Sequence, residues 1–264
     1  MKKMSKRNAC LTVALVAIIL LVLCEIFCFS CFFGDKVSDS VAQSIDMIAT
    51  RALGGIAFLA MLVNLDYNIL DPLKRPFLRS LVISLPAFAI AINNFPFSQV
   101  IKGEAAITGE WLTAALLLLE CMCVGFFEET AFRGVVFLGL LRRNPESKVW
   151  AFVSIALSSV IFGVVHLINI FESSPIAVLM QIGYSALIGA MCAVILMKTA
   201  NIWLCVVIHG LFNFCGAVVP RCGEGEIWDA FTVILTVVVS LAVLAYMIVI
   251  FVKDDAKTVK RIYE

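Results

Sequence analysis

Long apolar runs separated by short polar breaks are the feature of this sequence that most restricts its fold. A helix needs about 20 apolar residues to cross a hydrocarbon layer of about 30 Å. The segments that reach or approach this length lie at about residues 9–33, 48–65, 77–97, 111–141, 149–170, 175–197, 200–219 and 229–252. The sequence therefore predicts an all-α fold, a polytopic membrane helical bundle with about eight transmembrane helices.

Composition excludes the main alternatives to a membrane protein. Of the 264 residues, 62% are hydrophobic and only 15% are charged, whereas soluble domains are closer to half apolar and a quarter charged. A net charge of +1 provides no general basic field, so we expect no nucleic-acid partner. Because every loop between the apolar runs is short, residues 1–264 are expected to form a single membrane domain.

Basic residues predict the orientation of the chain in the bilayer. Lys and Arg near helix ends are retained in the cytoplasm. With both termini inside, most of the 20 basic residues fall on the cytoplasmic face, namely Lys2, Lys3, Lys6, Arg7, Lys74, Arg75, Arg79, Arg142, Arg143, Lys148, Lys198, Lys253, Lys257, Lys260 and Arg261. We therefore expect a multi-pass protein of the cell membrane with both termini in the cytoplasm.

A few polar side chains interrupt the apolar runs. Each ionisable group inside a span costs several kcal/mol unless it is paired, and it usually faces the bundle interior or a wet cavity. The set comprises Glu25, Glu120, Glu128, Glu129, Arg133, His166 and His209, with Asn213 as a polar companion. Glu25 and Glu120 lie nearer the expected outer interface, where a structural or water-exposed role is favoured. The others are candidates for a functional site.

Cysteines add little to this set. The chain has 10 of them, but most lie inside apolar runs, where a thiol acts as a small hydrophobe. Those buried in this way are Cys24, Cys28, Cys121, Cys123, Cys192, Cys205 and Cys215. No paired CxxC elements with zinc-ligand spacing are present, so a structural or lipid-facing role is expected for them.

Helical geometry separates the two neighbouring glutamates of residues 111–141. Glu129 and Arg133 are four residues apart and share a helix face, so they can form an ion pair that lowers the insertion cost of both. Glu128 is rotated from Glu129 by about 100° and is less committed to the arginine. Glu128 is therefore the carboxylate that is freer for chemistry. Taken alone, these residues could also be a purely ionic lock between helices.

Two further spans carry the only histidines. His209 and Asn213 are four residues apart, so they can address the same small ligand. Counting about 1.5 Å per residue from the cytoplasmic helix ends places Glu128, His166 and His209 at similar depths. The spacing therefore permits one shared, wet pocket formed by three helices.

The ordered motifs resemble those of the CPBP family, which comprises the type II CAAX prenyl proteases and bacteriocin-processing proteins and is also called the ABI family. The motifs lie within residues 111–219, which would be the catalytic core, and read EETAFRG at 128–134, FGVVH at 162–166 and HGLFN at 209–213. This resemblance implies an intramembrane endopeptidase that hydrolyses a peptide bond of a membrane-associated substrate.

The resemblance also implies a role for each residue. Glu128, with help from His166, would activate water. His209 and Asn213 would stabilise the oxyanion. Glu129 and Arg133 would hold the constellation in place. The implied mechanism uses no metal or other cofactor.

Several alternatives stay open at this point. A zinc-dependent version of the same protease would use Glu128, His166 and His209 as ligands, although no HExxH pair is present. A non-catalytic immunity or scaffold protein could keep the fold without activity. A proton-coupled transporter is less favoured, because the sequence has no clear repeats or broken spans. The substrate could be a CAAX-like tail, prenylated or not, or a leader peptide.

Overall fold

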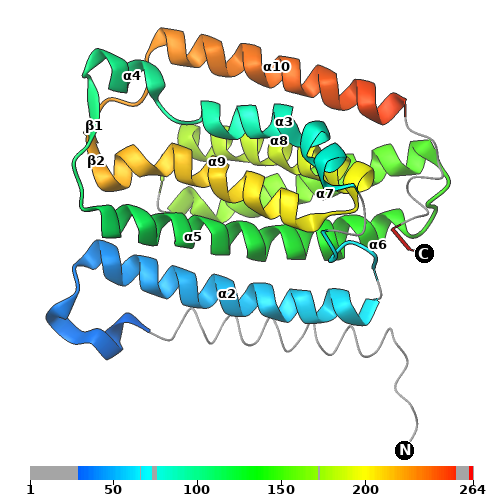
Figure 1. Ribbon diagram of the computed structural model, residues 1–264, viewed down its shortest axis with the longest axis horizontal. Coiled ribbons are helices and arrows are strands. Elements are labelled where there is room, and N and C mark those ends of the chain that lie inside the picture. Colours follow the sequence, from blue (N-terminus) through cyan, green and yellow to red (C-terminus); the bar gives the residue numbers. More distant parts are fainter. Residues whose placement is uncertain (1–28, 66, 73–75, 172, 254–261, 264) are drawn as a thin grey trace, which may run out of the picture.

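The computed structural model describes residues 29–263 apart from 66, 73–75, 172 and 254–261. Its long helices run side by side in one bundle, with α2 along one edge and α10 along the opposite edge (Figure 1). These helices are α2 Asp39–Leu65, α3 Phe77–Asn93, α5 Trp111–Glu129, α7 Lys148–Val165, α8 Pro175–Thr199, α9 Ile202–Cys222 and α10 Ala230–Val252. The prediction of an all-α membrane bundle is confirmed.

Shorter elements connect or extend the long helices. They are the 3₁₀ helices η1 Ser30–Lys36 and η3 His166–Phe171, the short helices α4 Phe97–Lys102 and α6 Leu138–Leu141, and the π-helix η2 Thr130–Phe137. Because η2 continues α5 and leads into α6, the predicted span at 111–141 is one continuous helical rod with a π-helical segment inside it. The spacing of the apolar residues in this span did not predict the change in winding.

Six helices of the described part of the chain are long and apolar enough to cross a membrane, and Phe77–Asn93 is a shorter apolar helix. The first expected span, at about 9–33, lies mostly outside the described residues. Eight spans therefore remain a prediction, whereas a multi-pass membrane protein is supported directly.

Two predicted helix boundaries were wrong. Helix α2 begins at Asp39, well before the expected start at about 48, because its first turns carry polar residues that do not extend an apolar run. Of these residues, Ser44 is buried. Helix α3 ends at Asn93 instead of about 97. The chain turns at the following residues, and a separate helix begins after Pro96, since proline restricts the residue before it to extended conformations.

Polar caps define where the later helices begin. The side chains of Ser147, Ser174, Asn201 and Asp229 accept hydrogen bonds from backbone N–H groups in the first turns of α7, α8, α9 and α10. Such caps satisfy donors that have no partner within a helix. The spans predicted from hydropathy therefore receive sharp N-terminal boundaries from residues in the polar breaks.

A two-stranded antiparallel ribbon lies at one end of the bundle (Figure 1). Strand β1, Ala105–Ile107, precedes α5, and strand β2, Gly223–Gly225, follows α9. A side chain at Gly223 would collide with the Ala106 carbonyl, so this strand needs glycine there. The ribbon, which the sequence did not predict, joins the corresponding ends of α5 and α9.

Helices α5 and α9 also touch along their length. A Cβ on Gly125 would lie 2.8 Å from the Val206 carbonyl oxygen and 3.0 Å from the Gly210 nitrogen. One on Gly210 would lie 3.1 Å from the Met122 Cα. Small residues allow this close approach of two backbones in a membrane bundle. The contact lies about one turn before the glutamate pair on α5, and Gly210 directly follows His209 on α9.

Candidate active site

The paired glutamates lie where the winding of the helix changes. Glu129 is the last residue of α5, and the π-helix begins at Thr130. The Thr130 hydroxyl donates to the carbonyl oxygens of Phe126, at 2.7 Å, and Phe127, at 3.0 Å. Its side chain therefore bonds to the preceding turn. π-Helical segments within α-helices are rare and occur frequently at functional sites.

Glu129 and Arg133 form the ion pair that their spacing predicts. Arg133 Nε lies 3.1 Å from Glu129 Oε2, and the two side chains are 2% and 0% exposed. The Arg133 guanidinium also lies over the ring of Phe162, 4.3 Å from its centroid, in a cation–π contact. Yet neither Glu129 Oε2 nor any of the three guanidinium nitrogens makes a well-aligned hydrogen bond to a described residue. Charge and the aromatic face hold this arginine in place.

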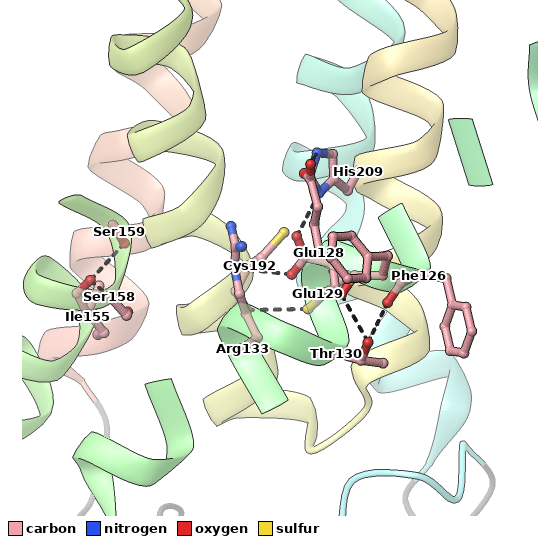
Figure 2. Close-up of polar contacts among 12 residues, drawn as sticks. Phe126, Glu128, Glu129, Thr130, Arg133, Ile155, Ser158, Ser159, Cys192 and His209 are labelled. Carbon is pink, nitrogen blue, oxygen red and sulfur yellow. Dashed lines mark hydrogen bonds and ion pairs between the residues drawn. The ribbon is translucent and has the colours of Figure 1, made fainter. Parts of the chain in front are cut away.

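His209 lies between the two glutamates (Figure 2). Its Nδ1 is 2.7 Å from Glu129 Oε1, and its Nε2 is 3.4 Å from Glu128 Oε2. Because Glu129 is paired with Arg133, its carboxylate accepts from Nδ1–H and orients the ring, leaving Nε2 toward Glu128. The sequence placed His209 with Asn213 and did not predict this link to Glu129, because the link depends on how α5 and α9 pack together.

Glu128 is the more accessible of the two carboxylates. Its side chain is 18% exposed, while that of Glu129 is fully buried. Beyond the 3.4 Å approach of His209, no other side chain among the described residues forms an ion pair with it. The expected division therefore appears in the geometry, with one carboxylate held by Arg133 and His209 and its neighbour contacted only by His209 at 3.4 Å.

His166 and His209 meet the same aromatic ring. Phe162 packs edge-on against His166 at 5.1 Å and against His209 at 5.8 Å between ring centroids. His166 Nδ1 lies 2.9 Å from the Phe162 carbonyl oxygen. A carbonyl only accepts, so Nδ1 is the donor, and in the neutral ring Nε2 then keeps its lone pair. His166 makes no hydrogen bond or ion pair with either glutamate in the described structure, but its free nitrogen can act as an acceptor.

Asn213 lies one helical turn beyond His209 on α9 and is half-buried. Its amide makes no hydrogen bond to any described residue, so its donors are available to a ligand. The six predicted site residues therefore come from α5 with its π-helical continuation, from the end of α7 and from α9. Their individual roles stay predictions.

The group with metal-binding geometry differs from the expected one. Among the residues that the structure describes, the ligand atoms within 4.8 Å of one another belong to Glu129, Cys192 and Cys205. The expected zinc ligands Glu128, His166 and His209 do not form such a group. The sequence gave the two thiols a structural role, and nothing in their local pattern places them beside a glutamate of another helix.

Comparison with known proteins agrees with this geometry. Residues 110–215 match the family model described as type II CAAX prenyl endopeptidase Rce1-like. The matched segment covers less than half of the chain but includes α5, η2, α7, α8 and most of α9, and with them all six predicted site residues. No curated protein and no solved structure matches the chain. The Rce1-like match supports a protease that acts on a membrane-associated protein or peptide.

Proposed function

We propose that this protein is an intramembrane endopeptidase that hydrolyses a peptide bond of a membrane-associated substrate with water activated by Glu128. The observation that carries the proposal is the unequal treatment of the two glutamates. Glu129 is fully buried between Arg133 and His209, whereas Glu128 is partly exposed and faces only His209 Nε2. A general base needs a carboxylate that can reach water, and Glu128 meets that need.

In the first step, Glu128 takes a proton from a water molecule whose oxygen forms a bond to the scissile carbonyl carbon. The lone pair on His166 Nε2 can accept the water's second hydrogen and so orient it. The carbonyl oxygen then becomes an oxyanion, for which Asn213 and a protonated His209 Nε2 would be donors. Donors that are already oriented toward developing charge each contribute a few kcal/mol to lowering the barrier.

In the second step, Glu128 delivers its proton to the leaving nitrogen as the carbon–nitrogen bond breaks. The products are a peptide with a new carboxylate and a peptide with a new amine. Glu129 and Arg133 do not touch the reacting atoms in this scheme. They neutralise each other and fix the His209 ring through Nδ1, so they are positioning residues.

The family match and the position of the site among membrane helices support a membrane-associated substrate. A CAAX-like tail is favoured by the Rce1-like match, and a leader peptide is the alternative. The distribution of basic residues supports both termini in the cytoplasm of a cell-membrane protein. Cleavage of either substrate in this scheme needs no metal, because Glu128 supplies the base and the side chains of His209 and Asn213 supply the hydrogen-bond donors.

The test compares two identical substitutions on one helix. The purified protein, in detergent micelles, is given a farnesylated CAAX peptide, its unprenylated form and a leader peptide, and cleavage is followed by mass spectrometry. Glu128→Gln should reduce the rate by about 10² to 10⁴-fold, the usual contribution of a general base. Glu120→Gln, also on α5, is the matched control and should stay within a few-fold of wild type.

Three outcomes would overturn parts of the proposal. Full activity of Glu128→Gln would remove it as the base. Activity that is lost on chelation and restored by one equivalent of zinc would replace the metal-free mechanism by the zinc-dependent one. Absence of cleavage of all three peptides by the wild-type protein would favour the non-catalytic scaffold.

A further inference from the structure

Two thiols from different helices meet the buried carboxylate of the site. Cys192 of α8 and Cys205 of α9 are both 0% exposed, as is Glu129. One oxygen of Glu129 and the two sulfur atoms all lie within 4.8 Å of one another. Figure 2 shows Cys192 beside Glu129 and the Arg133 guanidinium. The two thiols adjoin the proposed catalytic residues, but neither thiol takes part in the mechanism above.

The local fold holds the two thiols in place. Helices α8 and α9 are joined by Ala200 and Asn201, with Ala200 in a left-handed conformation, so the two helices form a tight hairpin. The Cys205 thiol donates to the Cys192 carbonyl oxygen at 3.3 Å. Glu129 Oε2 is buried and accepts no well-aligned hydrogen bond from a described residue. The third ligand therefore has an oxygen that is engaged only by the ion pair with Arg133 Nε.

The donor set suits a soft divalent cation. Thiolates bind zinc at about 2.3 Å and carboxylate oxygens at about 2.0 Å in tetrahedral sites, and tetrahedral geometry then places two thiolate sulfurs about 3.8 Å apart. A limit of 4.8 Å means that the ligands need to close by about 1 Å at most. Rotation of two cysteine side chains can supply that movement without a change of backbone.

Charge balance supports the same assignment. Two thiolates and a carboxylate carry three negative charges, which a divalent cation and Arg133 together neutralise. Without the metal, two buried thiolates beside Glu129 would lack compensating charge, so the thiols stay protonated. Metal binding thus releases two protons to solvent, as is usual when thiols become ligands.

We propose that Cys192, Cys205 and Glu129 form a site for a soft divalent cation such as Zn²⁺ or Cd²⁺, and that the bound cation inhibits the active site. A metal on Glu129 competes with Arg133 and with His209 Nδ1 for the same carboxylate. The His209 ring then loses the contact that orients its Nε2 toward Glu128. The inhibitory half of this inference rests on the proposed function, whereas the binding half does not.

The binding test uses the full-length protein in micelles, freed of chelators and titrated with Cd²⁺. Thiolate-to-cadmium charge transfer is followed by ultraviolet absorbance. Wild type should gain the absorbance of two thiolates at one equivalent of Cd²⁺. Cys192→Ser and Cys205→Ser should each lose that signal at one equivalent. Cys121→Ser, which removes another buried free thiol of the same bundle, should keep it.

Loss of absorbance in Cys121→Ser, or full retention in both Cys192→Ser and Cys205→Ser, would overturn the site. The inhibition arm measures peptide cleavage with and without one equivalent of Zn²⁺, each variant relative to its own metal-free rate. Wild type should fall at least tenfold, and Cys192→Ser should fall less than twofold. Cadmium binding with unchanged cleavage would refute inhibition but leave the protease intact. Absence of cleavage by metal-free wild type would instead refute the proposed function, and the absorbance would still decide the site.

Discussion

Two glutamates of α5 each pair with an arginine of another element, and the two pairs are built differently. Arg221 donates from Nη1 to Glu120 Oε1 at 3.1 Å and from Nη2 to Glu120 Oε2 at 3.3 Å, and the Ser44 hydroxyl donates to Oε2 at 2.6 Å. Both carboxylate oxygens of the Glu120–Arg221 pair, which we call the outer pair, therefore accept hydrogen bonds. The Glu129–Arg133 pair, which we call the inner pair, is different. Glu129 Oε2 and all three guanidinium nitrogens of Arg133 lack a well-aligned hydrogen bond within the described structure.

The difference indicates a structural role for the outer pair and a place in the candidate site for the inner pair. A satisfied polar network rigidifies a bundle, and a partly satisfied one leaves costly unpaired groups. The outer network ties α2, α5 and α9 together, in agreement with the structural role that was favoured for Glu120. The inner pair keeps unsatisfied groups next to His209 and the accessible Glu128. Residues that violate local rules in a folded protein cluster at functional sites.

The largest expected effect is that of Arg133→Ala. It leaves Glu129 buried with only His209 as a partner, and removing one member of a buried ion pair costs about 3–5 kcal/mol. Thermal unfolding in micelles, followed by circular dichroism, measures the loss. The peptide assay should also show little cleavage. Without Arg133, Glu129 is no longer held in place and cannot fix the orientation of the His209 ring. A smaller destabilisation than that of Arg221→Ala would contradict the contrast between the pairs.

Gly125 lies between the two pairs, and Gly125→Ala should disturb their relative positions. The added methyl group meets the Val206 carbonyl and the Gly210 nitrogen, and overpacking of this kind costs about 1–3 kcal/mol. Because α5 must shift relative to α9, we expect a large fall in the rate of peptide cleavage together with this modest loss of unfolding free energy. Gly139→Ala, on α6 with open space around its Cβ position, is the control and should change neither. Equal behaviour of both variants would show that the helix contact does not position the site.

Arg221→Ala tests the outer pair alone. Hydrogen bonds to charged groups contribute about 1.5–3 kcal/mol each, but Arg221 is 28% exposed and water replaces part of the loss. We expect a destabilisation of about 1–2 kcal/mol and cleavage within a few-fold of wild type. Unfolding temperature and the peptide assay are measured on one preparation. Loss of cleavage without loss of stability would assign the outer pair a functional role.

The smallest effect concerns the pair of Lys102 and Asp229, whose side chains are 48% and 24% exposed. A hydrogen bond from Lys102 holds the pKa of Asp229 below its ordinary value of 3.8, and the backbone and side chain of Thr232 add to this effect. A lowered folded-state pKa gives stability that is present above 3.8 and is lost as the pH falls through the folded value. Asp229→Asn should therefore flatten the dependence of unfolding temperature on pH below about pH 4. An unchanged dependence would contradict the role of this pair.

Hydropathy could predict the fold because membrane spans are defined by length and apolar composition, which a single sequence displays. It could not predict the first turns of α2, since their polar residues do not extend an apolar run and the burial of Ser44 depends on its contacts with Glu120 and Arg221. Hydropathy also could not predict the π-helical winding after Glu129, because the EETAFRG motif fits ordinary α-helical spacing equally well.

Helical spacing likewise predicted the Glu129–Arg133 pair, a contact within one segment. The contacts that depend on packing between helices were not predictable in this way. They include the link from His209 to Glu129, the shared Phe162 ring and the approach of Cys192 and Cys205. Motif resemblance named most of the site residues, but it did not show that His209 faces both carboxylates.

The glycine contact between α5 and α9 determines which parts of the protein can open. In the proposed function, a polypeptide substrate needs a gap between helices to reach Glu128. The backbones of α5 and α9 are in direct contact at Gly125 and Gly210, which leaves no room for such a gap between these two helices. The glutamates and His209 are therefore carried by two helices whose backbones are in direct contact. His166 instead begins the 3₁₀ segment at the end of α7, so we expect the gate for a polypeptide to form on that side and to move His166 as it opens.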